Sequence, residues 1–390
     1  MQYQNMMDYT TIEKILSTPN PFLTDPETAS QLRFDALKAS FKHHFINNVP
    51  YQAFCIDENI KPALVKSRSD LSKIPLIPSD FFRDVSAAEG IVDSISSVPS
   101  EQIARYFTTS GTGGQPSIYP YDLISLQTIN RSNVIIFDKV GDIDPNDYVL
   151  FLTPSPEQAD TGMVQGMYLT LKGLLQSPEK QVGFAVENNI LDSRLVIEEL
   201  NEIKGKTRHL YGPPYAFNEI SDQIIEGGLE INLDLESKAF TTGGWKSHKT
   251  GQISKDELDA KIEKAFKIKQ TNVRDGLGLT DIMSILLECE YGSKHVPPWI
   301  EVSIRDLNDP TWQTTVPLGE GGLIAFLDPL IGSFPAYIVT GDVGKLDISY
   351  NQQCNCGRYG PTITYLRRAG DPRGCALRQE HLMAKVNEAK

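Results

Sequence analysis

The sequence of 390 residues predicts an α/β fold. Short apolar segments, which are typical of strands, alternate with helical patterns through the middle of the chain. Loops rich in glycine, threonine and aspartate follow several of these segments. The composition is that of a globular protein, with 40% hydrophobic and 22% charged residues. In open α/β sheets ligands bind beyond the carboxyl ends of the strands, so we expect a site among these loops.

The first hundred residues are expected to be mainly helical. The pattern of apolar residues predicts a short helix over 11–16 and a long one over 27–47. His43 and His44 in the long helix have no partner at a metal-ligand spacing, and we expect them at the surface or at a helix cap. A passage interrupted by prolines follows, and we assign residues 1–100 to a mainly helical N-terminal part.

An alternating pattern predicts an α/β core over residues 101–366. A glycine pair at 227–228 directly follows one of its helices and is typical of a helix end. Residues 367–390 form a short C-terminal tail. In chain order, the strands and helices expected in the core include 147–153, 162–175, 190–203, 209–211 and 216–225.

The composition excludes several classes of protein. The formal net charge of −13 is unsuited to binding nucleic acid, because neutralising phosphates requires clustered lysine and arginine. No apolar run approaches the roughly 20 residues of a membrane-spanning helix, and the N-terminus lacks the pattern of a signal peptide. Five cysteines without a secretion signal argue against a disulfide framework. We therefore expect a cytoplasmic protein.

The most informative loop is 108–116, which follows the strand-like run 103–107 and reads Thr-Thr-Ser-Gly-Thr-Gly-Gly-Gln-Pro. Glycines let the backbone approach a ligand closely, and free N–H groups and hydroxyls can then converge on a phosphate. An ordinary surface turn has a similar composition, and the Gly-Lys-Ser/Thr ending of a Walker loop is missing. Three later loops, at 241–245, 274–281 and 339–342, also follow strand-like segments and could line one crevice.

These motifs resemble, in order, the core motifs of adenylate-forming enzymes: Thr-Ser-Gly-Thr-Gly-Gly at 109–114, then the loops ending in Gly-Gly, Gly-Leu-Thr-Asp and Thr-Gly-Asp. The resemblance is closer to the acyl-protein synthetases of bacterial bioluminescence, the LuxE component of fatty acid reductase, and covers nearly the whole chain. It implies the large domain of an adenylate-forming enzyme, with several packed sheets and helices and the small C-terminal lid largely absent. The segments that carry this closer match are 106–113, 212–214, 242–247, 295–299 and 373–375.

The resemblance implies that the protein activates a carboxylic acid with ATP and Mg²⁺, giving an acyl-adenylate and pyrophosphate. It places Gly243 and Gly244 beside the adenine and Thr280 at the α-phosphate. The residues implied for the β- and γ-phosphates are Thr108, Thr109, Ser110, Gly111, Thr112 and Gly113.

Four further residues take roles from the same resemblance. Asp281 would help to hold Mg²⁺, at a position where the family usually has glutamate. Asp342 would bond the ribose, since one carboxylate can accept from both hydroxyls. Arg367 or Arg368 would stabilise charge near the ribose or phosphate, and a surface arginine is the alternative.

Two departures from the family pattern bear on the acyl acceptor. The phosphate loop continues as Gln-Pro-Ser instead of Pro-Lys. The chain also stops about twenty residues after Arg368, where typical relatives continue into a lid that carries a catalytic lysine. A missing lid weakens an ordinary CoA ligase assignment. In the luminescence family a cysteine near the C-terminus becomes acylated, and Cys375 stands between Arg373 and Arg378, which favour the thiolate. An idle surface thiol is the alternative.

The pattern Cys289-x5-His295, followed downstream by Cys354-x-Cys356, offers three thiolates and one imidazole. This donor set matches a structural zinc site. Phenylacetate-CoA ligases, which this chain also resembles around 288–295 and 354–358, carry a similar arrangement. Three buried cysteines and a histidine bonded to the backbone are the alternative.

The sequence therefore predicts an ATP-dependent acyl-protein synthetase. Its substrate would be a carboxylic acid, expected to be a fatty acid, and its partner an acyl reductase or a carrier protein. An acyl-CoA or acyl-carrier-protein ligase of the phenylacetate-CoA ligase type is one alternative, and a non-catalytic nucleotide-binding scaffold is another. A homo-oligomer is compatible with this assignment.

Overall fold

The computed structural model describes residues 6–79, 81–82, 95–108, 117–159, 162–187, 190–231, 233–245 and 251–369. The chain forms two compact units. Unit 1 comprises residues 1–132, 279–284 and 295–390, and unit 2 comprises residues 133–278 and 285–294. The division into 1–100, 101–366 and 367–390 that the sequence suggests stays a prediction.

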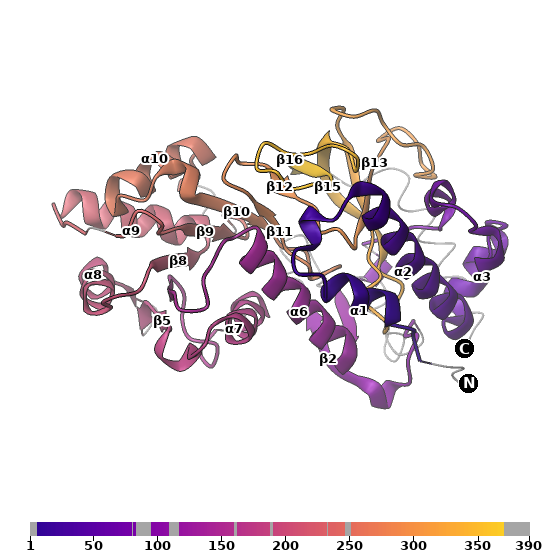
Figure 1. Ribbon diagram of the computed structural model, residues 1–390, viewed down its shortest axis with the longest axis horizontal. Coiled ribbons are helices and arrows are strands. Elements are labelled where there is room, and N and C mark those ends of the chain that lie inside the picture. The colour runs from indigo at the N-terminus through magenta and orange to yellow at the C-terminus, as the bar shows by residue number, and fades with distance from the viewer. Residues whose placement is uncertain are drawn as a thin grey trace. The chain divides into compact units, whose positions relative to one another are not determined.

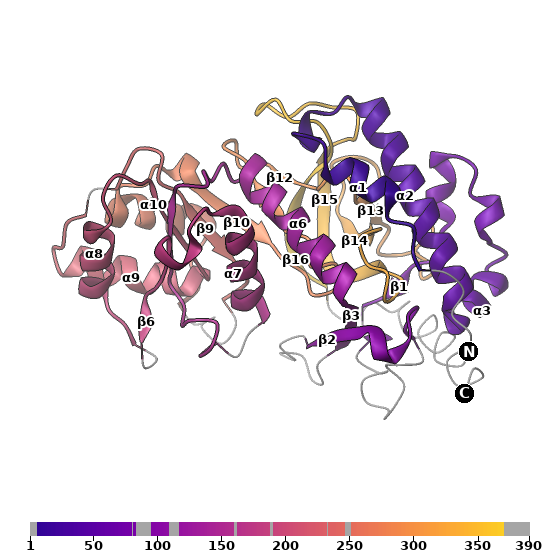
Figure 2. The ribbon, with the colours of Figure 1, turned by 60° about the horizontal axis from the view of Figure 1, so that its bottom comes forward.

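The N-terminal helices of unit 1 follow the predicted pattern. They are α1 (Thr10–Leu16), α2 (Pro26–Asn47) and α3 (Val49–Asp57). The side chain of Asp25 caps α2 by accepting from the N–H of Thr28, and a proline occupies the first turn, where no hydrogen bond is lost. Asn48 ends α2 and caps α3, so the chain turns between the two helices without an extended loop (Figure 2).

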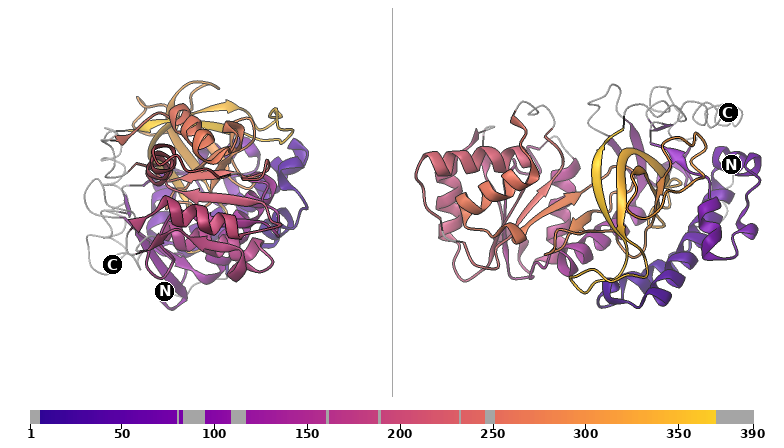
Figure 3. Two further views of the ribbon diagram at one scale, coloured as in Figure 1. Left: turned by 90° about the vertical axis from the view of Figure 1, so that its left-hand side faces the viewer. Right: turned by 90° about the horizontal axis from the view of Figure 1, so that it is seen from above.

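Unit 1 contains an antiparallel sheet in the order β13 (Glu301–Arg305), β14 (Gly322–Leu327), β15 (Tyr337–Ile348) and β16 (Thr362–Arg368). Every residue of β14 is buried, and β1 (Ile77–Pro78) pairs with β15 in parallel. In Figure 3 the yellow strand β16 lies along β15. A separate hairpin joins β2 (Ile103–Thr108) to β3 (Ile118–Asp122) and flanks the predicted phosphate loop.

Unit 2 has the predicted alternation of strands and helices. Its parallel strands have the order β5-β4-β8-β9-β10, and β11 pairs antiparallel with β10. The strands are β4 (Tyr148–Phe151), β5 (Val182–Phe184), β8 (Arg208–Gly212), β9 (Ala239–Thr242), β10 (Val273–Leu277) and β11 (Leu286–Glu288), with the small hairpin β6 (Val186–Glu187) and β7 (Ile190–Leu191). The two-residue strand β12 (Lys294–His295) begins in unit 2 and ends in unit 1. The helices are α6 (Leu123–Lys139), which begins in unit 1, and α7 (Gly162–Leu174), α8 (Ser193–Glu202), α9 (Pro214–Glu226) and α10 (Lys255–Phe266) (Figure 1).

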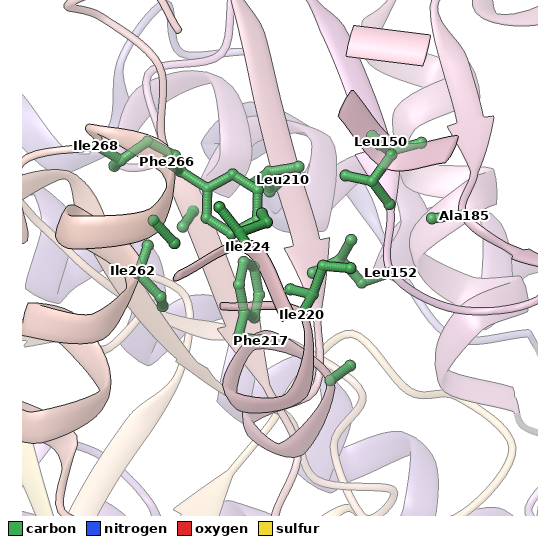
Figure 4. Close-up of a cluster of buried hydrophobic side chains, with 14 of the residues drawn as sticks. Leu150, Leu152, Ala185, Leu210, Phe217, Ile220, Ile224, Ile262, Phe266 and Ile268 are labelled. Carbon is green, nitrogen blue, oxygen red and sulfur yellow. The ribbon is translucent and has the colours of Figure 1, made fainter. Parts of the chain in front are cut away.

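The core of unit 2 lies between the sheet and the helices α9 and α10. Phe217, Ile220 and Ile224 recur at the helical spacing that gives α9 one apolar face. Leu210 from β8 and Phe266 from α10 contribute to the same cluster (Figure 4). Each fully buried side chain of this size stabilises the fold by about 1.5–3 kcal/mol. This packing fixes the strands whose ends carry the predicted loops.

Two expectations from the sequence need correction. The helix predicted over 190–203 is shorter, because Ile190 and Leu191 form β7 and Asp192 caps α8 at the N–H of Arg194. His43 and His44 are buried rather than at the surface, and their Nε2 atoms bond the carbonyls of Gly332 and Ile331 at 2.9 and 3.1 Å. Within the described residues no helix combines the length and apolarity required to cross a membrane.

Candidate functional site

The structure describes some of the predicted nucleotide-binding residues. Thr108 ends β2 at an exposed position, and Gly243 and Gly244 follow β9 in unit 2, also exposed. The backbone of Gly243 has a φ of +79°, which favours glycine. Outside the described residues lie Thr109, Ser110, Gly111, Thr112 and Gly113 of the phosphate loop, and Cys375.

Two tyrosines of β3 bind the Thr280-Asp281 pair within unit 1. The hydroxyl of Tyr119 donates to Oδ1 of Asp281, and the hydroxyl of Tyr121 donates to the main-chain carbonyl of Thr280 at 2.9 Å. Both tyrosines face the same side because residues i and i+2 of a strand do so. The strand thus holds the predicted metal ligand and its neighbour together.

Aromatic packing fixes these two phenol rings. The ring of Tyr119 stacks on Phe82 at a centroid distance of 4.5 Å, and Phe334 lies 5.6 Å from Tyr119 and 5.2 Å from Tyr121. Burial raises the pKa of both tyrosines well above the usual range, so each hydroxyl keeps its proton and acts as a donor.

Asp281 is buried, and it has no arginine or lysine at ion-pair distance among the described residues. Burial raises its pKa to about 6, the nearby charge of Asp342 adds to this rise, and the Tyr119 hydrogen bond and Arg368 oppose it. A carboxyl in this state is a strong site for a cation, because a positive charge would offset the cost of its burial.

The second predicted carboxylate, Asp342, is paired with an arginine from the neighbouring strand. Asp342 of β15 lies opposite Arg368 of β16, and Nη1 of Arg368 lies 3.1 and 3.2 Å from the two carboxylate oxygens. Burial raises the pKa of Asp342 against the pull of Arg368. Arg367 is exposed and donates to the main-chain carbonyl of Arg368 at 3.4 Å. Asp342 and Arg368 both act electrostatically on Asp281, so the three predicted site residues lie within electrostatic range of one another in unit 1.

Tyr119 and Tyr121 were not singled out from the sequence. Their alternation in Tyr-Pro-Tyr-Asp, three residues beyond Pro116 of the phosphate loop, is the signal that could have found them. In a sequence this pattern also describes any half-buried strand, so it does not by itself distinguish a site from packing.

The four predicted zinc ligands come together. Cys289, His295, Cys354 and Cys356 each offer one ligand atom, and these atoms all lie within 4.8 Å of one another. Nε2 of His295 lies 3.3 Å from Sγ of Cys356. In a tetrahedral site with Zn–S bonds of about 2.3 Å the sulfurs are about 3.8 Å apart, so the cluster could hold a metal ion after a small contraction.

Tight turns shape both halves of this cluster. Gly292 donates its N–H to the carbonyl of Cys289 at 2.9 Å, and Gly357 donates to the carbonyl of Cys354 at 2.8 Å. These two glycines have φ values of +67° and +85°. Each turn requires a residue with a positive φ, a conformation that glycine adopts without steric cost. The turns bring the thiols close to one another.

Comparison with known proteins identifies relatives along the whole chain. The profile of the acyl-protein synthetase family, LuxE, matches residues 1–383. A long-chain-fatty-acid–luciferin-component ligase of Vibrio harveyi is 25% identical over 393 residues, covering 100% of this chain and 98% of the relative. The ligase of the same name from Aliivibrio fischeri is 25% identical over 376 residues and covers 93% of both. A phenylacetate-coenzyme A ligase of Aromatoleum evansii is 32% identical over 120 residues, 29% of this chain and 26% of the relative.

Solved structures share the fold. A 2-hydroxyisobutyryl-CoA ligase in complex with 2-HIB-AMP and CoA, in an open conformation, aligns with a TM-score of 0.69 and 17% identity. The alignment covers 89% of this chain and 76% of that one. At this identity the likeness shows the fold alone, and it confirms the predicted α/β fold of adenylate-forming enzymes.

Proposed function

This chain belongs to the acyl-protein synthetase (LuxE) family, and from that premise we propose that it is a ligase that activates a fatty acid with ATP. A substrate carboxylate oxygen attacks the α-phosphorus, the bond to the β-phosphate breaks, and acyl-adenylate and pyrophosphate form. The observation that carries the proposal is the group of Asp281, Asp342 and Arg368 in unit 1. The names of the two luciferin-component ligases support a long-chain fatty acid as substrate.

The proposed roles follow from chemistry and position. Asp281 would hold Mg²⁺, because its buried carboxylate has one phenol donor and no lysine or arginine partner among the described residues, and Mg²⁺ prefers oxygen ligands. Bound Mg²⁺ would neutralise charge on the phosphate oxygens. Asp342 would accept from the ribose hydroxyls, beside Arg368. Thr280 would contact the α-phosphate, Arg367 remains a candidate for charge stabilisation, and the glycine loops, including Thr108, would bind the rest of the nucleotide.

The acyl group would pass to Cys375. Its thiolate attacks the acyl carbonyl, a thioester forms, and AMP leaves. Ala369 is anchored beside the site, since its N–H donates to the carbonyl of Gly341 at 2.8 Å. Five residues lie between Ala369 and Cys375, so the two Cα atoms are six steps apart along the chain and can be at most about 22 Å from each other. This reach supports transfer within one molecule, followed by delivery to a partner acyl reductase or carrier protein.

CoA is the alternative acceptor. The local identity to a phenylacetate-CoA ligase favours it, because that stretch reaches 32% while the luciferin-component ligases match at 25%. In this alternative the thioester would appear on CoA and the protein would stay unlabelled.

A structural zinc ion held by the four-residue cluster completes the proposal. Metal analysis of purified protein should give about one zinc per chain, and replacement of Cys354 by serine should lower both zinc content and stability, because zinc binding contributes folding free energy. A metal-free protein of full stability would rule the site out.

The main experiment separates the acceptors. We expect a carboxylate-dependent ATP–pyrophosphate exchange, and label from a radioactive fatty acid on the wild-type protein but not on the Cys375→Ala variant. The variant should keep the exchange reaction. Labelled CoA without labelled protein would favour the alternative, and absence of exchange with any acid would indicate a non-catalytic scaffold.

A further inference from the structure

The hydrogen bond between Tyr119 and Asp281 connects two distant parts of unit 1. Tyr119 lies in β3, the strand that returns from the predicted phosphate loop, and pairs with Phe107 of the outgoing strand β2. Asp281 lies 162 residues further along the chain. The hydroxyl of Tyr119 donates to Oδ1 of Asp281, so it occupies one of the two carboxylate oxygens and leaves Oδ2 without a donor from this tyrosine.

The phenol is held rigidly in this position. Tyr119 is fully buried, and its ring packs against Phe82 and Phe334 at centroid distances of 4.5 and 5.6 Å, while these two rings lie 5.3 Å from each other. Its hydroxyl also contacts the Ser117 side chain. A ring held in such a three-ring cluster can restrict the rotation of the carboxylate it bonds, because a change of the carboxylate rotamer would break the hydrogen bond.

A purely structural role accounts poorly for this arrangement. A buried carboxylate paired with one neutral donor stabilises a fold less than an apolar side chain of the same size would. The neighbouring Tyr121 donates to a main-chain carbonyl, a group that needs a hydrogen-bond partner in any folded protein. Tyr119 instead donates to an acidic side chain. The cost of such a carboxylate is offset when a cation binds it.

We propose that Tyr119 is a positioning residue for the divalent cation that accompanies ATP: by holding Oδ1 of Asp281, it presents Oδ2 to the metal. The proposal rests on the metal-binding role proposed above for Asp281. It also links the phosphate loop to the metal site, because β3 carries Tyr119 directly out of that loop. Partners of this kind, which bind a metal ligand and not the metal, change affinity or activity by about 10–100-fold when removed.

The test compares ATP binding with and without Mn²⁺, which replaces Mg²⁺ and gives an electron paramagnetic resonance signal. The variants are Tyr119→Phe, which removes only the hydroxyl, and Asp281→Asn, which removes the proposed ligand. Tyr337→Phe is the matched control, because Tyr337 is an equally buried tyrosine of unit 1 whose hydroxyl bonds Ser40 at 2.7 Å. Thermal unfolding of each variant checks that it folds.

In the wild type Mn²⁺ should tighten ATP binding, and in Tyr119→Phe this enhancement should fall about 10-fold, with ATP affinity in the absence of metal unchanged. Tyr337→Phe should keep the full enhancement. A folded Tyr119→Phe that also keeps it, or that binds Mn²⁺ more tightly, would overturn the proposal while leaving the function intact. If Asp281→Asn keeps the enhancement, or the wild type shows none, the proposed function itself fails.

Discussion

Two aspartates six residues apart, Asp275 and Asp281, have opposite surroundings. Asp275 belongs to unit 2 and bonds a cation of its own chain: Nζ of Lys294 lies 2.6 Å from Oδ2, and the hydroxyl of Thr241 donates to Oδ1 at 3.0 Å. The N–H of Asp275 donates to Glu288 at 2.9 Å, and Lys294 lies 3.5 Å from the same glutamate. Every charge of this group has a partner.

Asp281, in unit 1, has only the neutral phenol of Tyr119 as a side-chain donor within the described chain. The difference teaches how to separate architecture from function among carboxylates, of which Asp275 is partly exposed and Asp281 is buried. Where the chain supplies the cation, the carboxylate is part of the fold and its loss destabilises the protein. Where the chain supplies none, the carboxylate is costly until a ligand brings positive charge, and its loss should affect activity instead.

The largest expected effect is on activity. Asp281→Asn should lower kcat/KM for ATP–pyrophosphate exchange by about 10³-fold, roughly 4 kcal/mol, which is typical for the loss of a group that stabilises transition-state charge. The unfolding free energy should not fall, because a neutral amide removes a buried charge. Steady-state kinetics and denaturant unfolding of the same preparation test this. If the Asp281→Asn variant is inactive and also strongly destabilised, Asp281 is part of the fold in the same way as Asp275.

Lys294→Met should give the converse result. Lys294 is buried, so removing it leaves Asp275 without its ion-pair partner and Glu288 with Lys255 alone, at 3.4 Å, at a cost of about 3 kcal/mol of unfolding free energy. Lys73→Met is the control, since its pair with Asp70 is exposed and worth less than about 1 kcal/mol. The midpoints of denaturant unfolding, compared at an unchanged dependence of the unfolding free energy on denaturant concentration, measure the stability loss in both variants. A loss below 1 kcal/mol for Lys294→Met would contradict the view that this network holds unit 2 together.

Arg368→Gln should have a smaller effect that depends on pH. Ionised Asp281, with its pKa raised to about 6, is the form that binds a cation, so kcat/KM should fall as the pH drops through about 6. Arg368 lowers the pKa of Asp281 and of Asp342, and its removal should therefore move this acidic limb to higher pH. We expect kcat/KM to fall only several-fold near pH 6, because the arginine is exposed. This loss should fade at higher pH. Arg131→Gln, which breaks an exposed pair with Glu13 in unit 1, is the control, and an identical shift in both variants would mean that the Asp342 pairing does not matter.

A feature of this molecule can be predicted from the sequence when the residues that form it are close together along the chain, and is harder to predict when they are far apart in sequence. Helix α2 follows from apolar spacing and a local Asp25 cap, and the clustering of the four Cys and His side chains could be predicted from residue type. The role of Tyr119 could not, because its partner lies 162 residues away and the strand pattern is the same with or without it. His44 was placed wrongly for the same reason, since its partners Ser97 and Ile331 lie 53 and 287 residues away.

Buried histidines extend the comparison to stability, with the smallest expected effect. His209 of unit 2 has a carboxylate partner, with Nε2 2.8 Å from Asp147, whereas the partners of His44 of unit 1 in the described part of the chain are a serine hydroxyl and a carbonyl. Burial lowers the pKa of both, and that of His44 well below 6.5.

The unfolded chain therefore binds more protons than the folded one below pH 6.5, and stability should fall as the pH drops. Neutral His44 should account for less than about 1 kcal/mol of the loss between pH 7 and pH 6. In His44→Gln the difference in unfolding free energy between these pH values should shrink, and in His209→Gln it should shrink less, because Asp147 already stabilises the charged imidazole. Denaturant unfolding of the wild type and the two variants at pH 7 and pH 6 measures how much each substitution reduces the pH-dependent loss of stability. An equal change in the two variants would show that the carboxylate partner of His209 does not moderate its titration.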